Sequence, residues 1–478
     1  MMLAGKSKLV KDISANTVQS VATQVLGLLI FYLTSKYLGK SEFGELNWSM
    51  AVASTCIAIA SLGLDLVFVR KIAAGENVIK IGGIHFFHSL AAGLFVCLIA
   101  LSIEWIQPGF SRGHPFFFLI MLTLAIANIA NSFKLCMNGL EAYSRLAVLA
   151  VLTNVLKLSA MVVLFITGYF TLRNVVFVLL FTSAVEVALG YLSLNLRIKA
   201  TLIPAISLKP YRLFVMEALP QLGVVLFDSA LARIDWILLG VIGTAAATAD
   251  YSFTYKVFEL SKLPLLIIAP VLLTRFSRIL RQGGIHVTKQ NIERSKVFLQ
   301  LEMFVVMLIP IFLVMCWTPL IDYFTDNKYG AVNEKVYWML ALCVPLAAMV
   351  NYLWTLGFAQ GQLRTIMIIT VLASVINVVA NLLLIPVIGT YGAALSYLIS
   401  VATQLILYLR FIRRDKITLD APSCLAPVLA ALAAVILAKL ITDNVIFATS
   451  LAVGVYVFAG LLGGMVKPQK VAGFLKDE

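Results

Sequence analysis

The sequence is dominated by apolar stretches long enough to cross a lipid bilayer. A membrane-spanning helix needs roughly 20 apolar residues, because the hydrocarbon core of a bilayer is about 30 Å thick. We identify fourteen such stretches, at about residues 13–37, 43–69, 82–106, 115–135, 146–168, 174–196, 214–241, 250–274, 297–321, 335–359, 365–387, 391–411, 424–441 and 445–465. With 61% hydrophobic and only 13% charged residues, the chain lacks the polar surface of a soluble domain. We therefore predict an all-α membrane protein with about 14 transmembrane helices, which excludes soluble enzymes and disordered chains.

The positions of the basic residues predict how these helices are oriented. The chain has 37 Lys and Arg residues against 23 Asp and Glu residues. An even number of spans puts both termini on one side. When that side is the cytoplasm, 26 of the 37 basic residues fall in inner segments and 6 in outer segments. Because cytoplasmic loops are enriched in Lys and Arg, we expect both termini in the cytoplasm. The basic excess then reports orientation, and we expect no nucleic-acid partner.

A weak internal repeat indicates two related halves. Residues 151–164 are similar to residues 371–384 at an offset of 220, with identical residues at five positions. The two segments belong to spans that are six apart, so the halves would be parallel repeats. We expect two six-helix lobes around a central cavity, formed by residues 1–199 (spans 1–6) and 200–415 (spans 7–12). Residues 416–478 would add spans 13 and 14.

Short motifs along the chain occur in the order found in a known superfamily. They are Asn16, Tyr37-Leu38-Gly39, Glu42-Phe43-Gly44, Leu62-Gly63-Leu64-Asp65 before Arg70, Asp235-Trp236-Ile237-Leu238-Leu239-Gly240, Gly357 with Gln360-Gly361, and Asn377 and Asn381 before Leu384-Ile385-Pro386 and Gly392-Ala393-Ala394. In these motifs the chain resembles the MOP exporter superfamily, and within it the polysaccharide or O-antigen (Wzx-type) flippases. The resemblance covers about residues 10–415. It implies translocation of undecaprenyl-diphosphate-linked oligosaccharide repeat units across the bacterial inner membrane, by alternating access, for O-antigen, capsule or exopolysaccharide synthesis.

Two other transport functions stay open within the same superfamily: a lipid II flippase and a cation-coupled multidrug exporter. A membrane enzyme such as a glycan polymerase is disfavoured, because no loop is long enough to form a catalytic domain. We find no P-loop, nucleophile elbow or cluster of metal ligands in the sequence, so we expect no cofactor and no metal. The expected partners are the lipid-linked glycan, membrane lipids and a glycan polymerase or other assembly protein, and we expect the protein to act as a monomer.

Charged residues inside the spans are the best pointers to a site, because each costs several kcal/mol unless it meets a partner or a cavity. The span at 214–241 carries Asp228, Arg233 and Asp235, and the next span carries Lys256, Glu259 and Lys262. By helix rise, Arg233 and Lys256 lie at a similar depth on the outer side. Either the cluster is neutralised and only joins the two helices, or its bases, with Lys262 in reserve, face the cavity and bind a diphosphate.

Other polar residues in the first six spans are further candidates. Lys157 and Glu186 either form a buried pair, or Lys157 lines the cavity. A polar stripe on the first span is expected to line the inward-open cavity, and it consists of Asn16, Gln19 and Gln24. Asp65 and Glu259 are candidates for coupling a cation. Several groups have simpler interpretations: Arg70 as a snorkelling base, Glu217 as a helix-start carboxylate, and His85 and His88 as interfacial residues.

Overall fold

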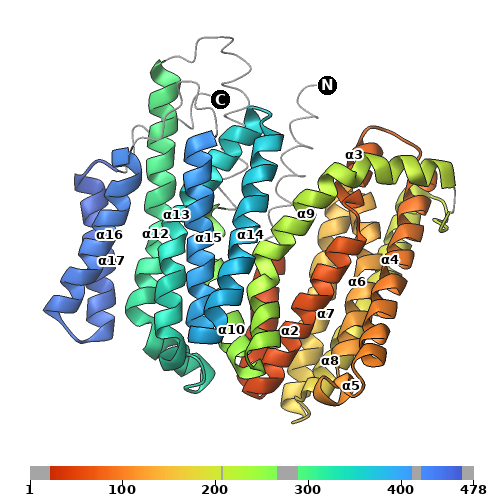
Figure 1. The fold of residues 1–478 in the computed structure, drawn as a ribbon, viewed down its shortest axis with the longest axis horizontal. Coiled ribbons are helices and arrows are strands. Elements are labelled where there is room, and N and C mark those ends of the chain that lie inside the picture. Colours follow the sequence, from red (N-terminus) through yellow and green to blue (C-terminus); the bar gives the residue numbers. More distant parts are fainter. Residues whose placement is uncertain (1–21, 206–207, 266–288, 412–420, 466–478) are drawn as a thin grey trace. The chain divides into compact units, whose positions relative to one another are not determined.

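The computed structural model describes residues 22–205, 208–265, 289–411 and 421–465, and this part of the chain consists of helices joined by short connections (Figure 1). Residues 22–37 are helical and precede α2. The elements that follow are α2 (Lys40–Ala60), α3 (Leu64–Ala73), α4 (Val78–Ile106), α5 (Phe110–Gly113), α6 (Phe117–Gly139), α7 (Tyr143–Ile166), α8 (Leu172–Ile198), α9 (Leu208–Ile242), α10 (Ala245–Ser261), α12 (Lys289–Thr325), α13 (Gly330–Ala359), α14 (Leu363–Ile388), α15 (Thr390–Phe411), α16 (Ala421–Ile441) and α17 (Val445–Leu462).

The predicted all-α membrane fold is confirmed. In the described ranges, ten helices are long and apolar enough to cross a membrane, and α2 with α3 would make an eleventh span that is bent by 56°. Three predicted spans fall outside these eleven. Those at 13–37 and 250–274 run beyond the described residues, and the apolar length of α9 is interrupted by Asp228, Arg233 and Asp235. The count of fourteen therefore stays a prediction.

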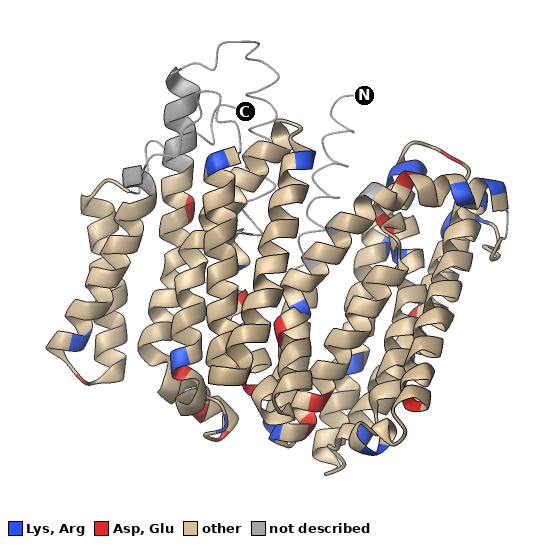
Figure 2. Ribbon diagram, viewed as in Figure 1, with Lys and Arg blue, Asp and Glu red and all other residues tan. Residues whose placement is uncertain are grey.

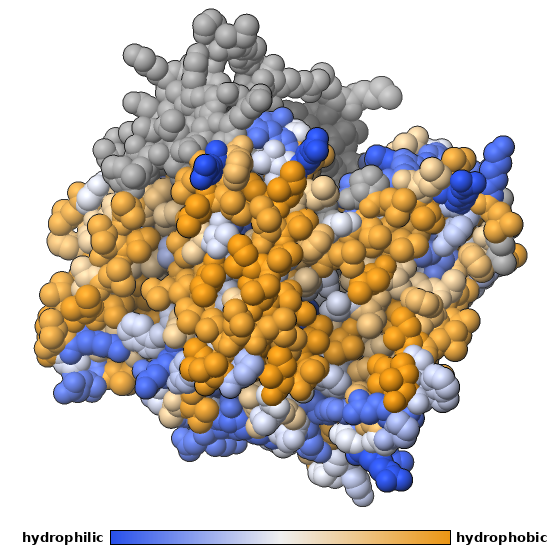
Figure 3. Space-filling model, viewed as in Figure 1, coloured by the Kyte–Doolittle hydropathy of each residue, from blue (hydrophilic) through white to orange (hydrophobic). Residues whose placement is uncertain are grey.

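The outer surface of the helices is apolar, as expected for contact with lipid. Large side chains such as Ile106, Leu440 and Ile446 are 73%, 78% and 81% exposed. Hydrophobic residues cover the helices on the face drawn in Figure 3. Charged residues gather near helix ends and connections, with few along the middle of the helices (Figure 2). Such a distribution is stable when the middle of each helix lies in hydrocarbon and its ends lie in water.

The chain divides into two compact units. The first contains residues 1–240 and 244–249, and the second contains residues 241–243 and 250–478. Packing therefore places most of α9 with the first unit, whereas the internal repeat assigns this helix to the second half. The lobe boundaries at residues 199 and 415 stay predictions.

In the first unit, α6 is the central helix and packs against α2, α3, α4, α7 and α8. Two clusters of buried residues hold these helices together. One surrounds Phe68 and Phe133, and the other surrounds Trp48 and Phe117. The Trp48 ring also donates a hydrogen bond of 3.2 Å to the backbone oxygen of Ile237, which ties α2 to α9. These contacts fix the helices that carry the polar residues of this unit.

In the second unit, α13 and α14 pack against α15, and α16 and α17 pack against α12 and against each other. The motif after Leu384 forms a helical hairpin: α14 and α15 are joined by Gly389, whose φ of +57° suits glycine. The connection expected around residues 322–334 is shorter than predicted, because α12 continues to Thr325 and α13 begins at Gly330. The Asp322 carboxylate accepts hydrogen bonds from the backbone nitrogens of Gly330 and Ala331, at 2.7 and 3.1 Å, and so caps α13.

Candidate functional site

A break between α2 and α3 shapes a polar site in the first unit. Leu62 and Gly63 have φ values of +51° and +69°, which stop α2 and allow α3 to start at Leu64. Gly63 lies directly against α9: a Cβ at this position would be 2.7 Å from the backbone nitrogen of Leu222. Only glycine fits here without displacing α9. The break places Asp65 in the first turn of α3, beside α6.

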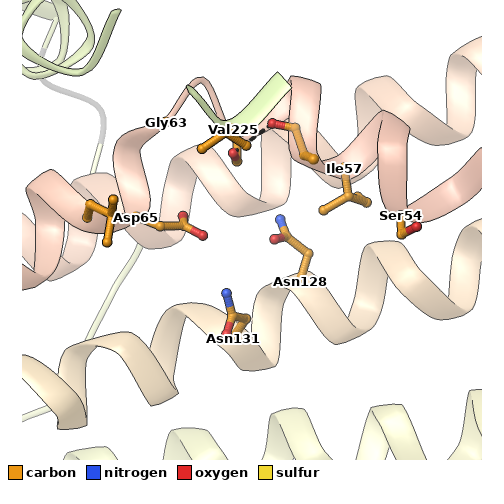
Figure 4. A pocket seen from close by; sticks show the side chains of 10 residues that line it. Ser54, Ile57, Gly63, Asp65, Asn128, Asn131 and Val225 are labelled. Carbon is orange, nitrogen blue, oxygen red and sulfur yellow. Dashed lines mark hydrogen bonds between the residues drawn. The ribbon is translucent and has the colours of Figure 1, made fainter. Parts of the chain in front are cut away.

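A cavity of about 200 Å³ lies next to this break. Its polar lining consists of Ser54, Ser61, Asp65, Asn128 and Asn131, and its apolar lining includes Ile57, Leu66 and Val225. Asp65 on α3 and the two asparagines on α6 point toward a common space (Figure 4). In the part of the chain that the structure describes, neither asparagine amide is engaged by another protein group. Both amides are therefore available to a ligand.

A buried imidazole lies behind Asp65. His85 on α4 is 2% exposed, and its Nε2 lies 3.3 Å from Asp65 Oδ1, while its Nδ1 lies 2.7 Å from Ser132 Oγ. The ring stacks on Phe68 with 4.1 Å between the ring centres. His88 is also buried, with Nδ1 3.0 Å from the Tyr211 hydroxyl. Both histidines thus bond to side chains of other helices of the bundle, and their position at the membrane interface stays a prediction.

Three charged residues meet between α6, α7 and α8. Glu186 forms an ion pair of 2.8 Å with Lys134, rather than the pair with Lys157 that was one interpretation of the sequence. Lys157 lies close enough for the charges of Glu186 and Lys134 to act on it, but in the described ranges its ammonium group has no ion pair. Two basic side chains thus lie near one carboxylate, and the carboxylate pairs with Lys134.

Two groups near the end of α3 contact α9. Glu217 pairs with Arg70 and, at 3.1 Å, with Lys71. Arg70 is therefore an ion-pair partner rather than a free snorkelling base. Glu217 lies inside α9, which begins at Leu208, and is not a helix-start carboxylate. These pairs fasten the cytoplasmic end predicted for the second span to α9.

The charged residues of α9 and α10 have separate local environments. The Arg233 guanidinium lies 4.4 Å from the centre of the Trp236 ring, and its Nη1 is buried without a hydrogen bond among the described residues. Asp235 is buried. On α10, Lys256 pairs with Glu259 at 2.7 Å. Because Arg233 and Lys256 belong to different units, the predicted cluster that joins them stays a prediction.

The remaining predicted site residues are distributed as follows. Lys262 lies 4.5 Å from the Phe258 ring centre and 3.4 Å from the Tyr397 hydroxyl, in the second unit. Gln24 is exposed on the helix of residues 22–37. Asn16, Gln19 and the side chain of Asp228 lie outside the described residues.

Sequence reasoning missed the two cavity asparagines. Asn128 and Asn131 are three residues apart in an apolar span, so they share a helix face, and this spacing was a usable signal. The contact between Asp65 and His85 had no such signal, because it joins two helices. Chemically, the site offers amide, hydroxyl and carboxylate groups, which hydrogen-bond to hydroxyl-rich ligands. In the described part of the chain, no three His, Cys, Asp or Glu side chains group as metal ligands would.

The described part of the chain thus consists of apolar helices that are able to cross a membrane, and its first unit encloses a small cavity with a polar lining. A family model described as polysaccharide biosynthesis protein matches residues 9–280, which is more than half of the chain. The chain therefore belongs to the polysaccharide biosynthesis protein family, as its resemblance to the flippases of the MOP superfamily predicted. No curated protein matches the sequence significantly.

Solved structures share the fold. The lipid II flippase MurJ in an inward closed conformation superposes with a TM-score of 0.72 at 12% identity, covering 94% of this chain and 98% of that one. An inward-facing multidrug resistance MATE family transporter of the MOP superfamily has a TM-score of 0.63 at 15% identity, covering 84% and 99%. A MOP superfamily transporter from Pyrococcus furiosus has a TM-score of 0.54 at 12% identity, covering 84% and 95%. At these identities the likeness concerns the fold alone.

Proposed function

We propose that the protein flips undecaprenyl-diphosphate-linked oligosaccharide repeat units across the bacterial inner membrane, for O-antigen, capsule or exopolysaccharide synthesis. It would act as a monomer, with both termini in the cytoplasm, and a glycan polymerase or other assembly protein would take up its product. The observation that carries the proposal is the cavity beside Asp65, because Asn128 and Asn131 present unengaged amides there. Free amides and a carboxylate match the alternating donors and acceptors of sugar hydroxyls.

The diphosphate requires positive charge, and two groups of the first unit supply it. Lys157 lies beside the Lys134–Glu186 pair and has no ion pair among the described residues, so its ammonium group would be available to a phosphate. Arg233 has a buried nitrogen without a hydrogen bond among the described residues. Guanidinium and ammonium groups stabilise phosphate oxygens strongly where water is scarce. Lys256 is a weaker candidate, because Glu259 already neutralises it.

Alternating access accounts for movement of the head group. The polyprenyl tail would stay in lipid while the sugars and diphosphate pass through the cavity. Outward movement of an anion is favoured by a membrane potential that is negative inside, by about 2.3 kcal/mol per charge per 100 mV. Energy alone therefore requires no coupled cation; if one is coupled, Asp65 at the cavity wall would bind it.

Reconstituted transport tests the substrate class. Purified protein in liposomes is assayed for translocation of an undecaprenyl-diphosphate oligosaccharide, of lipid II and of a cationic dye, and we expect the first to move fastest. Faster movement of lipid II or of the dye would contradict the proposal and favour a lipid II flippase or a drug exporter.

Cavity variants test the site. Each hydrogen bond contributes about 0.5–1.5 kcal/mol, so the double variant Asn128→Ala, Asn131→Ala should slow oligosaccharide translocation roughly tenfold. The matched control is Asn154→Ala on α7, because the Asn154 amide already donates to the Ala150 backbone oxygen at 2.8 Å. Equal rates for the double variant and the control would remove the cavity from the mechanism.

A further inference from the structure

A carboxyl group is buried in the second unit, away from the site described above. Glu302 lies on α12, and its side chain is 0% exposed. Its Oε1 accepts a hydrogen bond of 3.1 Å from Nδ2 of Asn351 on α13. Its Oε2 is buried and has no hydrogen-bond partner among the described residues. Among the described residues, one neutral amide is thus the only polar group that hydrogen-bonds to this carboxyl.

No charged group of the described residues compensates for Glu302. Its helix packs against α13, α16 and α17. Apart from the charged residues treated below, the ionisable side chains of these three helices are Tyr337, Cys343, Tyr352, Cys424 and Tyr456, which are uncharged in their ordinary form at neutral pH. The Tyr456 hydroxyl donates to the backbone oxygen of Phe304 and does not reach the carboxyl.

The charged residues on the same three helices are far from Glu302. Lys439 on α16 lies over the ring of Trp338, at 4.5 Å. Trp338 precedes Asn351 by 13 residues on α13, which is about 20 Å along a helix. Glu334 and Lys335 lie still nearer the start of α13. Glu302 therefore has no ionic partner in the described part of the second unit.

The hydrogen bonding suits a neutral carboxylic acid rather than a carboxylate. A buried carboxylate needs several donors or a cation to replace the water that it has lost. A neutral carboxylic acid needs fewer donors. Its carbonyl oxygen accepts the hydrogen bond from the Asn351 amide, and its other oxygen carries the proton. We propose that Glu302 and Asn351 form a proton-binding site, in which Oε2 of Glu302 takes up one proton from water when α12 and α13 close around it.

The same geometry gives the site a role in a transport cycle. Asn351 is half-buried and lies on the neighbouring helix α13, so it is the more exposed member of the pair. When α12 and α13 part and water reaches the carboxyl, the O–H bond breaks and the proton leaves to water. One proton is then exchanged per cycle of opening and closing. This inference rests on the transporter fold and not on the proposed glycan substrate.

Infrared spectroscopy of the purified, detergent-solubilised protein tests the protonation without any substrate. The spectrum of the wild type minus that of Glu302→Gln at neutral pH should contain the carbonyl band of a protonated carboxylic acid. The matched control is Glu334→Gln, because Glu334 accepts from Thr318 at 2.7 Å and lies near the helix end. Its difference spectrum should contain carboxylate bands. Carboxylate bands for Glu302 as well would overturn the proposal.

A second variant keeps the test decisive should Glu302→Gln not fold. Asn351→Leu removes the amide donor and leaves Glu302 in place, so it should shift the acid carbonyl band without abolishing it. An unchanged spectrum would show that Asn351 does not hold the acid.

Transport in liposomes then tests the exchange of the proton. An imposed pH gradient should change the rate of the wild type and of Glu334→Gln, and should leave the rate of Glu302→Gln unchanged. A Glu302→Gln rate that still follows the gradient would refute proton exchange at this site. If no lipid-linked glycan is moved at all, the proposed substrate fails, while the infrared result still decides the proton-binding site.

Discussion

Replacing Gly63 by alanine tests how the bend between α2 and α3 is maintained. The φ of Gly63 is +69°, and a left-handed backbone costs an L-residue about 1–2 kcal/mol. The new Cβ would also lie 2.7 Å from the backbone nitrogen of Leu222 and 2.8 Å from the backbone carbon of Gln221. Overpacking of this kind costs about 1–3 kcal/mol more, so the free energy of unfolding should fall by about 2–5 kcal/mol.

Gly75 provides a matched control for this prediction. Its φ is +85°, but no heavy atom lies within 4 Å of a Cβ built there. Gly75→Ala should therefore cost only the conformational part, about 1–2 kcal/mol. Thermal denaturation of both purified variants in one detergent measures the difference, and Gly63→Ala should have the lower midpoint. Equal midpoints would refute the argument that α9 occupies the space beside Gly63.

Three other substitutions have effects that differ with burial. Glu186→Gln leaves Lys134 without its carboxylate and should lower the free energy of unfolding by about 2–3 kcal/mol. The loss is smaller than for a fully buried pair because Lys134 is 29% exposed. A denaturation midpoint equal to that of the wild type would contradict this prediction. Arg70→Ala breaks the pair with Glu217, in which the side chain of Arg70 is 65% exposed and that of Glu217 is 38% exposed. The free energy of unfolding should therefore fall by less than about 1 kcal/mol, and a larger decrease would argue for a buried pair. Trp317→Phe removes an indole hydrogen bond of 2.9 Å to a backbone oxygen, worth about 1 kcal/mol, and leaves a gap at a fully buried site. The free energy of unfolding should therefore fall by more than about 1 kcal/mol in the same assay, whereas no change would show that this bond contributes nothing.

Local patterns in the sequence predicted local structure well. The apolar stretches gave the helices, because a span needs length and hydrophobicity and both are visible in one segment. The pairing of Lys256 with Glu259 was predictable because residues three apart along a helix share a face. The hairpin at Gly389 depends on a proline and a glycine in one short segment, which are visible in the sequence. Each of these features depends on residues that are close in the chain.

Contacts between helices were not predictable in this way. Glu186 had two basic residues within reach, and the rotation of α6 and α7 about their axes decides in favour of Lys134. The contact of Asp65 with His85 likewise needs the break after α2. The sequence does not single out Glu302, because the span that contains it is strongly apolar on average. One charged residue barely alters mean hydropathy, yet its burial is decided by the neighbouring helices.

The unequal partners of Glu186 lead to a last prediction, on Lys157. A charged residue in a span is retained at a cost, and an ion pair is one way to compensate for that cost. Lys134 has this compensation and Lys157 has no ion pair in the described ranges, although the charge of Glu186 acts on it. Lys157→Met should therefore change the free energy of unfolding by about 1 kcal/mol or less, since Glu186 keeps its partner. In the double variant Lys134→Met, Lys157→Met, the free energy of unfolding should fall by more than the sum of the decreases in the two single variants. The reason is that Glu186 then has neither basic side chain beside it.

A function for Lys157 would appear as lost transport at unchanged stability. Glycan display in cells that contain normal amounts of Lys157→Met should fall strongly, whereas Lys134→Met should reduce display only as far as it reduces protein levels. Full display by Lys157→Met at the wild-type denaturation midpoint would remove Lys157 from diphosphate binding. A midpoint as low as that of Glu186→Gln would instead show that Lys157 is needed to hold the helices together. The combination of near-neutral stability and lost display is expected only if the uncompensated ammonium group meets the substrate.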